Sequence, residues 1–282
     1  MRILVTGASG FIGRKLVERL VLEKNEVAIY SRKNACDFPE LVKIFAGEIN
    51  ALSESIQTFA PNYVFHLAGL SIYPKNDEDR ESLWEANVLF GAKLVEILKI
   101  NKNVVFVNFN TSLAYQGIGI HPHSYYAITK ACFLQTLSYY TEKNHFKAFN
   151  LILYNVYGVN DSTKRAINYI IDSLGAHIPV LMSPGGQVMD FIHVDDVIQL
   201  CIELLKQTPS IPMEDIHVGT GRGITLKETA YLISALSGKQ TNIQFGGIAY
   251  RDDEKMVNIA PIEHNRFWKS TISIEQGFLS LI

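Results

Sequence analysis

A glycine-rich turn close to the N-terminus constrains this chain more than any other feature. It reads Gly7-Ala8-Ser9-Gly10-Phe11-Ile12-Gly13, directly after an apolar run at residues 3–6 and before an amphipathic stretch. Glycines between a strand and a helix let the backbone approach a ligand closely, and the helix N-terminus then presents N–H groups and a partial positive charge to an anion. The turn therefore predicts a phosphate-binding loop. The alternative is a tight turn that needs glycine only for its backbone angles.

Beyond the turn, short apolar runs alternate with longer stretches of helical period, which is the pattern of βαβ units. The expected strands lie at residues 3–6, 27–30, 42–46, 63–67, 104–108 and 148–154, and the expected helices at residues 12–23, 53–59, 80–99 and 124–143. The run Val104-Val105-Phe106-Val107 is apolar on both faces, as in a parallel strand that helices cover on both sides. The predicted fold class is α/β, a Rossmann doubly wound parallel sheet with helices on both faces plus a smaller C-terminal α/β substrate lobe.

The pattern changes after Gly158, where the elements become shorter and prolines are frequent. We expect the dinucleotide-binding Rossmann domain at residues 1–158 and about 190–212, because a helix at residues 194–206 fits a return to the main sheet. The substrate-binding lobe would then comprise residues 159–189 and 213–282.

The composition is that of an ordinary globular protein, with 48% hydrophobic and 19% charged residues in a chain of 282. The net charge of −2 and the lack of long charged runs leave no electrostatic footprint for nucleic acid or anionic membranes, so neither is an expected partner. The absence of a signal peptide and the three scattered cysteines predict a soluble, cytoplasmic protein. No zinc-ligand spacing occurs among the histidines and cysteines, so no metal is expected.

The end of the second expected strand indicates the cofactor. It reads Ile29-Tyr30-Ser31-Arg32-Lys33, with no carboxylate and two adjacent cations. An acidic residue at this place binds the ribose hydroxyl of NAD, whereas a nearby arginine accommodates the 2′-phosphate of NADP. NADP(H) is therefore favoured over NAD(H), with Ser31, Arg32 and Lys33 as expected contacts. The alternative is that both cations are solvated loop charges.

A tyrosine and a lysine in the segment Tyr126-Ala127-Ile128-Thr129-Lys130 share one face of an expected helix. A cation close to a tyrosine lowers its pKa from about 10, and the phenol can then exchange a proton with a carbonyl or alcohol oxygen while hydride moves to or from nicotinamide. Asn110-Thr111-Ser112 follows the strand expected at residues 104–108, at the sheet edge where ligands bind. A hydroxyl there could bind the reacting oxygen. The alternative is a turn whose polar side chains satisfy its own backbone.

Together these motifs resemble the extended short-chain dehydrogenase/reductases, and among them the NAD-dependent epimerase/dehydratase family of nucleotide-sugar enzymes. The resemblance covers almost the whole chain, and it implies that Thr111, Tyr126 and Lys130 are catalytic, with Lys130 also binding ribose. The segments similar to the family's other cofactor-binding motifs are Gly47-Glu48-Ile49, His66-Leu67-Ala68-Gly69, Asn87-Val88-Leu89-Phe90-Gly91 and Tyr154-Asn155-Val156-Tyr157-Gly158. They imply cofactor contacts by Glu48, Ile49, Leu67, Ala68, Gly69, Asn87, Tyr154 and Val156.

The resemblance also implies a site for a nucleotide sugar, to which Asn155 would contribute. Arg251 stands where the family often has a diphosphate-binding arginine, but two further arginines of the family pattern are absent. Lys164 and Arg165 would therefore have to supply more of the positive charge. Ser112, and His123 in the loop before Tyr126, complete the expected substrate contacts. The alternative is that His123 is a solvated loop residue and that Lys164 and Arg165 are surface charges.

Two departures from the family pattern narrow the reaction. Ser112-Leu113 replaces the acidic pair of the dehydratases, so dehydration is not expected. The segment from Thr111 to Tyr126 is short and resembles that of the paratose and abequose synthase-type reductases. This implies NADP(H)-dependent reduction of a nucleotide-linked keto-sugar, an NDP-4-keto-6-deoxyhexose, in deoxysugar biosynthesis for lipopolysaccharide O-antigen.

Two alternatives to this reductase are an NAD(P)-dependent NDP-sugar 4-epimerase and a non-catalytic NADP(H)-binding regulator, since a fold does not imply a function. A homodimer is implied by the family resemblance alone.

Overall fold

The computed structural model describes residues 1–32, 38–116, 119–163, 165–261 and 268–282. Lys33 and Lys164, expected from the sequence to bind cofactor and substrate, lie outside the described residues. The chain divides into two compact units, one formed by Met1–Ile152 with Leu200–Ile216 and the other by Leu153–Gln199 with His217–Ile282. Helix α7 (Val194–Leu204) begins in the second unit and ends in the first.

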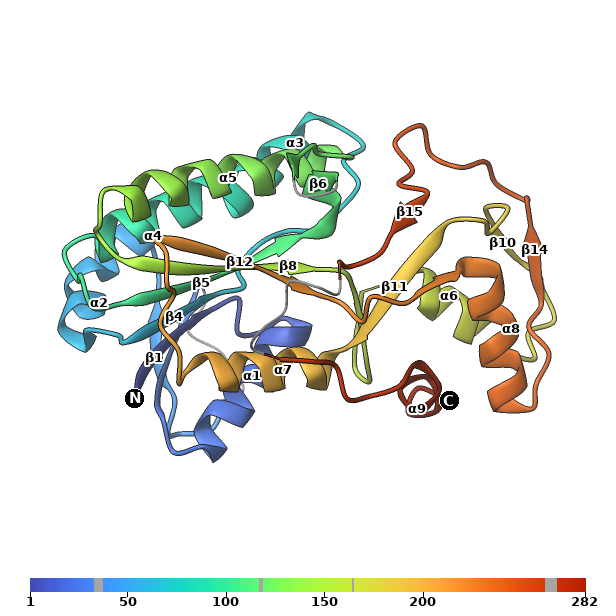
Figure 1. The fold of residues 1–282 in the computed structure, drawn as a ribbon, viewed down its shortest axis with the longest axis horizontal. Coiled ribbons are helices and arrows are strands. Elements are labelled where there is room, and N and C mark those ends of the chain that lie inside the picture. Colours follow the sequence, from blue (N-terminus) through green and yellow to red (C-terminus); the bar gives the residue numbers. More distant parts are fainter. Residues whose placement is uncertain (33–37, 117–118, 164, 262–267) are drawn as a thin grey trace. The chain divides into compact units, whose positions relative to one another are not determined.

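The first unit is built on a seven-stranded sheet with the order β12-β8-β5-β4-β1-β2-β3 (Figure 1). Its strands are β1 (Arg2–Thr6), β2 (Glu26–Ser31), β3 (Lys43–Ala46), β4 (Tyr63–His66), β5 (Val105–Thr111), β8 (Lys147–Leu153) and β12 (Met213–Val218). The pairs from β3 through β2, β1 and β4 to β5 are parallel, and Thr6 lies between Tyr30 and His66 in register. The predicted Rossmann sheet is confirmed, and its strand order changes direction between β1 and β4, which is where open α/β sheets bind ligands.

Helices cover both faces of this sheet, with α1 on one face and α2, α4 and α5 on the other (Figure 1). The helical segments of the first unit are α1 (Phe11–Leu22), η1 (Ile49–Leu52), α2 (Ser53–Phe59), α3 (Asp77–Trp84), η2 (Glu85–Leu89), α4 (Phe90–Leu98), η3 (Ser112–Ala114) and α5 (Tyr125–Glu142). The short strands β6 (Tyr115–Gln116) and β7 (Gly119–Ile120) pair antiparallel before α5. The face beneath α4 and α5 is densely aromatic, because Phe106 and Phe133 pack around the buried His66 ring.

The helix expected at residues 80–99 begins earlier than predicted and is not uniform. It starts at Asp77, since the Asn76 side chain accepts the Asp79 N–H at 2.8 Å, and its polar first turn carries no hydrophobic period to detect. The acidic residues of that turn suit the positive end of the helix dipole. Its middle segment, η2, is a π turn that precedes α4.

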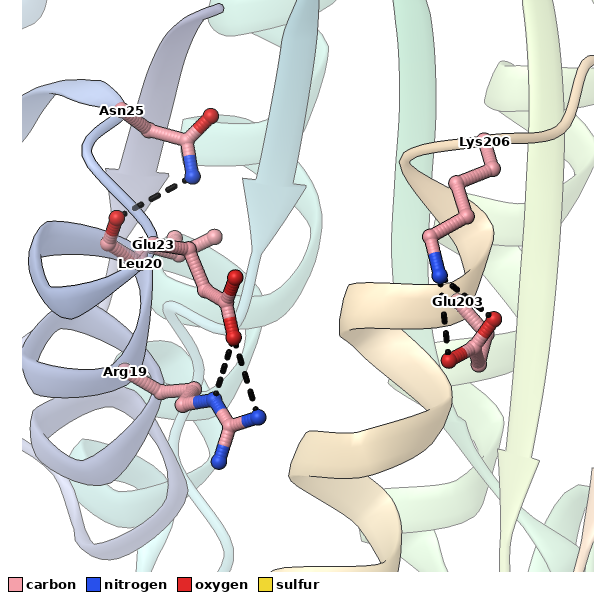
Figure 2. Close-up of polar contacts among 6 residues, drawn as sticks. All are labelled: Arg19, Leu20, Glu23, Asn25, Glu203 and Lys206. Carbon is pink, nitrogen blue, oxygen red and sulfur yellow. Dashed lines mark hydrogen bonds and ion pairs between the residues drawn. The ribbon is translucent and has the colours of Figure 1, made fainter.

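The C-terminal ends of α1 and α7 are held by local polar contacts (Figure 2). Arg19 pairs with Glu23 at 3.0 Å in α1, and the Asn25 side-chain amide donates to the Leu20 carbonyl at 3.0 Å. Lys206 pairs with Glu203 at 3.1 Å after α7. These pairs are exposed, so each contributes little to stability. Among the helices of the described residues, none is both long and apolar enough to span a bilayer.

The second unit has its own small sheets and core. Its elements are β9 (Asn155–Tyr157), α6 (Ala166–Asp172), β10 (Val180–Met182), β11 (Val188–His193), β13 (Gly223–Thr225), α8 (Leu226–Ser237), β14 (Ile243–Phe245), β15 (Val257–Asn258) and α9 (Ile274–Leu279). Strand β11 pairs with β9, β13 and β15, while β10 pairs with β14. The buried carboxylate of Asp190 in β11 accepts hydrogen bonds from the backbone of Thr220, Gly221 and Ala260 at 2.8 to 3.1 Å, which ties the loop ends of this unit together.

Candidate active site

The turn between β1 and α1 requires glycine at two positions. A Cβ atom on Gly7, whose φ is +69°, would lie 2.5 Å from the Ala68 nitrogen, and a Cβ on Gly13 would lie 2.2 Å from the Gly7 oxygen. The turn thus packs directly against the chain that leaves β4. Gly10 precedes α1, donates to the Gly7 carbonyl at 3.0 Å and is exposed together with Ser9. Phe11 and Ile12 begin the helix and are partly buried. The accessible helix N-terminus fits a phosphate group.

Asn87, in the π turn, joins three parts of this region. Its side-chain oxygen accepts the Leu70 N–H at 2.7 Å, and its amide hydrogens are donated to the Leu70 carbonyl and to Thr129 Oγ1, both at 2.9 Å. A Cβ on Gly69 would lie 2.9 Å from the Asn87 oxygen, so the close approach depends on that glycine. Asn87 is buried and connects the segment after β4 with the helix that carries Tyr126 and Lys130. Both amide hydrogens are donated to protein atoms, which favours a supporting role over a direct cofactor contact.

The segment from Leu67 to Ala68 is fixed by β1. The Leu67 N–H donates to the Thr6 carbonyl at 3.1 Å, and the Ala68 N–H donates to Thr6 Oγ1 at 3.3 Å. The same hydroxyl lies 2.9 Å from Nδ1 of His66. Because Thr6 Oγ1 accepts from the Ala68 N–H, its own hydrogen can be donated to His66 at the end of β4. Thr6 thus connects β1 with β4 and with the peptide of Ala68 beside the glycine turn.

The carboxyl end of β2 presents Ser31 and the exposed Arg32. The Tyr30 hydroxyl donates to the Gly47 carbonyl at 2.9 Å, which brings the following Glu48 to the same edge. Burial raises the pKa of Tyr30, the Glu48 carboxylate raises it further and the Arg32 guanidinium lowers it, so both charges lie within electrostatic reach of the phenol. Glu48 is exposed and Ile49 is buried in the core, so any ligand contact of Ile49 would come from its backbone.

Tyr126 and Lys130 lie on α5, whose first turn is capped by Ser124 accepting the Ala127 N–H at 3.2 Å. Tyr126 is partly buried and Lys130 is only 5% exposed. Burial lowers the pKa of Lys130 to about 8. Within the part of the chain that the structure describes, no hydrogen bond or ion pair engages the Lys130 ammonium.

The Lys130 ammonium acts electrostatically on His66. Burial lowers the pKa of His66 to about 3, and Lys130 lowers it further as the second cause. His66 is therefore neutral at physiological pH and adds no second positive charge beside the lysine.

Thr111 is the last residue of β5, so the expectation that the strand ends at Asn108 and that Asn110 and Thr111 follow it is wrong. Asn108, Asn110 and Thr111 are buried polar residues whose side chains bond within the protein, which is why the strand continues through a polar sequence. Thr111 Oγ1 accepts the Leu113 N–H at 3.3 Å and caps η3. The accepted bond orients the hydroxyl, whose own hydrogen can be donated elsewhere.

The other expected residues of this loop differ in exposure. Ser112 is 2% exposed and thus largely enclosed by protein, while His123 is partly buried. The His123 N–H donates to the Leu113 carbonyl at 2.9 Å, and its ring stands edge-on to that of His121 at 5.6 Å between centroids. The segment after Thr111 is therefore fixed by the chain that leads into α5.

The second unit carries the remaining candidates. The Tyr154 hydroxyl lies 3.1 Å from Nδ1 of His217, and Asn155 donates to the Asp190 carbonyl at 3.1 Å. Arg165 caps α6, donates to the carbonyl of the buried Val156 at 3.1 Å and pairs with Asp161 at 3.4 Å. The guanidinium of Arg165 is thus engaged by its own unit.

Arg251 lies in an exposed segment of the second unit. Lys255, a cation that no sequence motif indicated, lies nearby in the chain and is half buried, and this burial lowers the pKa of its ammonium. In the first unit, Arg14 is a further cation near the glycine turn. Its guanidinium lies 5.2 Å from the centre of the Phe38 ring, beyond the end of β2. Its place directly after Gly13 was the available sequence signal.

Comparisons with known proteins identify the family and the fold. The model of the NAD dependent epimerase/dehydratase family matches residues 3–219. A CDP-abequose synthase of Salmonella muenchen is 28% identical, over 100% of this chain and 97% of the relative. The solved structure of the Thermus thermophilus UDP-glucose 4-epimerase with NAD has a TM-score of 0.84 at 23% identity, covering 99% of this chain and 97% of the other. MoeE5 in complex with UDP-glucuronic acid and NAD has a TM-score of 0.87 at 22% identity, covering 99% and 96%.

The family model spans most of the chain, and the similar synthase covers it from end to end. The chain therefore belongs to the NAD-dependent epimerase/dehydratase family and is an NAD(P)-dependent enzyme of the extended short-chain dehydrogenase/reductase type.

Proposed function

We propose that this enzyme reduces the keto group of a nucleotide-linked 4-keto-6-deoxyhexose with NADPH. The observation that carries the proposal is the Lys130 ammonium, which is 5% exposed and lies one helical turn after Tyr126. A buried cation without a hydrogen-bond or ion-pair partner in the described residues has a high desolvation cost, which ribose hydroxyls and a developing phenolate would offset. The similarity to a CDP-abequose synthase favours a CDP-linked sugar as the first substrate to test.

The turn between β1 and α1 fits a dinucleotide because Ser9 and Gly10 are exposed at the N-terminus of α1. Gly7 and Gly13 allow the close backbone packing that holds the turn in this place. The N-terminus of α1 would hold the pyrophosphate, Lys130 the ribose and the β2 edge the adenosine end. When bound, the nicotinamide supplies the hydride. Tyr126 gives its phenolic proton to the sugar oxygen, and Thr111 donates its hydroxyl hydrogen to the same oxygen. Lys130 stabilises the phenolate that Tyr126 leaves behind.

We propose NADP(H) rather than NAD(H) from the charges at the end of β2. Ser31 and Arg32 stand where an acidic residue would bind the ribose hydroxyl, and Arg14 adds a second guanidinium in the helix turn beside Phe38. A 2′-phosphate is a dianion that two arginines can bind. The solved relatives carry NAD, so this assignment is specific to the residues of this chain.

The two units have separate roles in this proposal. The first unit binds the dinucleotide and carries Thr111, Tyr126 and Lys130. The second unit binds the sugar nucleotide through Asn155 and through cations that include Arg251 and the half-buried Lys255.

We further propose a homodimer formed through the exposed face of η2 and α5, where Leu89, Ile128 and Tyr139 are 47%, 40% and 57% exposed. Sedimentation of the protein would test it, and a monomer at micromolar concentration would contradict it.

The direct test offers the purified enzyme NADPH with 4-keto-6-deoxy sugars linked to CDP, dTDP and GDP, and follows the loss of NADPH absorbance. Consumption with one sugar nucleotide supports the reductase.

The Tyr126→Phe variant is expected to lose more than about 100-fold in kcat while it keeps its Kd for NADPH, because only the proton donor is removed. Tyr125→Phe is the matched control, since that phenol accepts a hydrogen bond from Trp84 at 2.8 Å instead. Full activity of the Tyr126→Phe variant would refute the mechanism.

A 4-epimerase is the second candidate, and the likeness to a solved UDP-glucose 4-epimerase favours it. An epimerase oxidises and re-reduces the same carbon, so it consumes no net cofactor. Interconversion of two NDP-sugars by enzyme that retains its dinucleotide through purification, without NADPH loss, would establish the epimerase and exclude the reductase.

A further inference from the structure

A chain of buried side-chain hydrogen bonds runs through the first unit to the backbone of Thr111. We propose that Tyr115 and Asn150 are positioning residues that fix the orientation of Thr111. The inference rests on the function proposed for Thr111, because it gives that residue its geometry.

The Tyr115 hydroxyl is the common acceptor of the chain. It receives hydrogen bonds from the side-chain amides of Asn150 at 2.9 Å and of Asn110 at 3.3 Å. Tyr115 is 4% exposed, and its burial together with the nearby Asp215 carboxylate raises the pKa of the phenol. The hydroxyl therefore stays protonated and neutral while it accepts the two amide N–H groups. A phenolate at this buried place would carry a high desolvation cost.

Asn110 transmits this contact to Thr111. Its amide donates to Tyr115, and its side-chain oxygen accepts the Thr111 N–H at 2.8 Å. Both polar atoms of the Asn110 carboxamide are thereby fixed. Asn110 connects the end of β5 with Tyr115, the residue that follows η3. Thr111 Oγ1 in turn accepts the Leu113 N–H at 3.3 Å. A shift of Tyr115 would therefore move the turn that orients the Thr111 hydroxyl.

Asn150, on β8, anchors Tyr115 from the neighbouring strand. Its oxygen accepts from Asn108 at 2.8 Å, and its second amide hydrogen is donated to the Asp215 carboxylate at 2.7 Å. The side chain can adopt only one orientation, because the flipped amide would bring its oxygen against that carboxylate. Asp215 lies on β12, so strands β5, β8 and β12 all support the position of Thr111.

No feature of the proposed chemistry needs a phenol at residue 115 or an amide at residue 150. A buried phenylalanine and a leucine would fill these places at lower desolvation cost. The connected polar side chains instead specify one arrangement of the turn, which is the property that a residue orienting a substrate oxygen needs.

The test is a double-mutant cycle on kcat with the full-length enzyme, in which Tyr115→Phe and Thr111→Ala are combined. We expect Tyr115→Phe to lower kcat about tenfold with KM for NADPH unchanged, and to lower it less than about twofold when Thr111 is already alanine. Tyr63→Phe is the matched control. The hydroxyl of Tyr63 donates to the Gln207 carbonyl at 2.5 Å and takes no part in this chain of hydrogen bonds. That substitution is expected to have the same effect in both backgrounds.

Amide hydrogen exchange of Thr111, measured by NMR, gives a second readout that needs no substrate. Tyr115→Phe is expected to raise the exchange rate of the Thr111 N–H about tenfold, whereas Tyr63→Phe leaves it unchanged. Additive effects in the kinetic cycle, or an unchanged Thr111 exchange rate, would overturn the inference. A wild-type enzyme that turns over no nucleotide sugar would refute the proposed function instead, and the exchange measurement would still decide whether Tyr115 positions Thr111.

Discussion

Replacing Lys130 by methionine is expected to stabilise the cofactor-free protein while removing its activity. Lys130 is 5% exposed, and burial alone lowers the pKa of its ammonium from 10.5 to about 8. A lowered lysine pKa means that folding disfavours the charged form. The folded protein therefore carries a destabilising charge at neutral pH, and methionine removes the charge while it keeps a flexible apolar chain of similar length.

The magnitude follows from the pKa. One pKa unit corresponds to about 1.4 kcal/mol, so a fall from 10.5 to about 8 costs the folded state about 3 kcal/mol at pH 7. Methionine and lysine have nearly equal helix propensities, so α5 itself is not affected by the exchange. We expect the free energy of unfolding of Lys130→Met to exceed that of the wild type by about 2 to 3 kcal/mol.

The pH dependence gives the sign of the effect. Between pH 8 and 10.5 the unfolded chain binds more protons at this lysine than the folded chain does, so wild-type stability rises with pH in that window. Below pH 8 the cost is present in full. The advantage of the methionine variant should therefore be largest at pH 7 and decline towards pH 10.

Urea unfolding at pH 7 and at pH 10, followed by circular dichroism, measures both quantities. Lys143→Met, on an exposed residue at the end of the same helix, corrects for the loss of a lysine as such. A Lys130→Met variant that is equally or less stable than the wild type at pH 7, with no change in the difference at pH 10, would refute the reasoning. Saturating NADPH should stabilise the wild type more than the variant, since the bound ribose offsets the desolvation cost only where lysine is present.

Two further predictions concern the cofactor site. Gly13→Ala places a Cβ 2.2 Å from the Gly7 oxygen and should lower the free energy of unfolding by more than about 2 kcal/mol. Gly10→Ala, whose Cβ has its nearest contact at 3.3 Å, should keep the stability and raise the Kd for NADPH. Equal stability of the two variants in urea unfolding would contradict the packing argument. Arg32→Ala should raise the KM for NADPH about tenfold with little effect on the KM for NADH. Arg19→Ala, whose arginine pairs with Glu23, is the control and should change neither KM. An equal change in both KM values of the Arg32→Ala variant would exclude Arg32 as a 2′-phosphate ligand.

The sequence alone determined the architecture of the first unit, since that architecture depends on local rules. Strand and helix periods are set by backbone geometry, and the glycine turn can only be made where no Cβ intrudes, so the βαβ order and the loop after β1 could be predicted from short segments. The same holds for Tyr126 and Lys130, because a spacing of four on a helix places both on one face wherever the helix lies. Where local signals were weak, as in the polar first turn of α3 and the polar end of β5, the predicted boundaries were wrong.

The tertiary structure decided the environment of those residues. The burial that lowers the pKa of Lys130 depends on tertiary packing, in which α5 lies against η2, α4 and β5. So do the bond between Asn108 and Asn150, which lie 42 residues apart, and the bonds that Asn87 makes from a π turn. The pairing of Arg165 with Asp161 could not be foreseen either, because it depends on how the two side chains are turned. Periodicity and spacing determine which residues share an element, whereas burial and hydrogen-bond partners depend on which elements become neighbours, and only the folded chain specifies that.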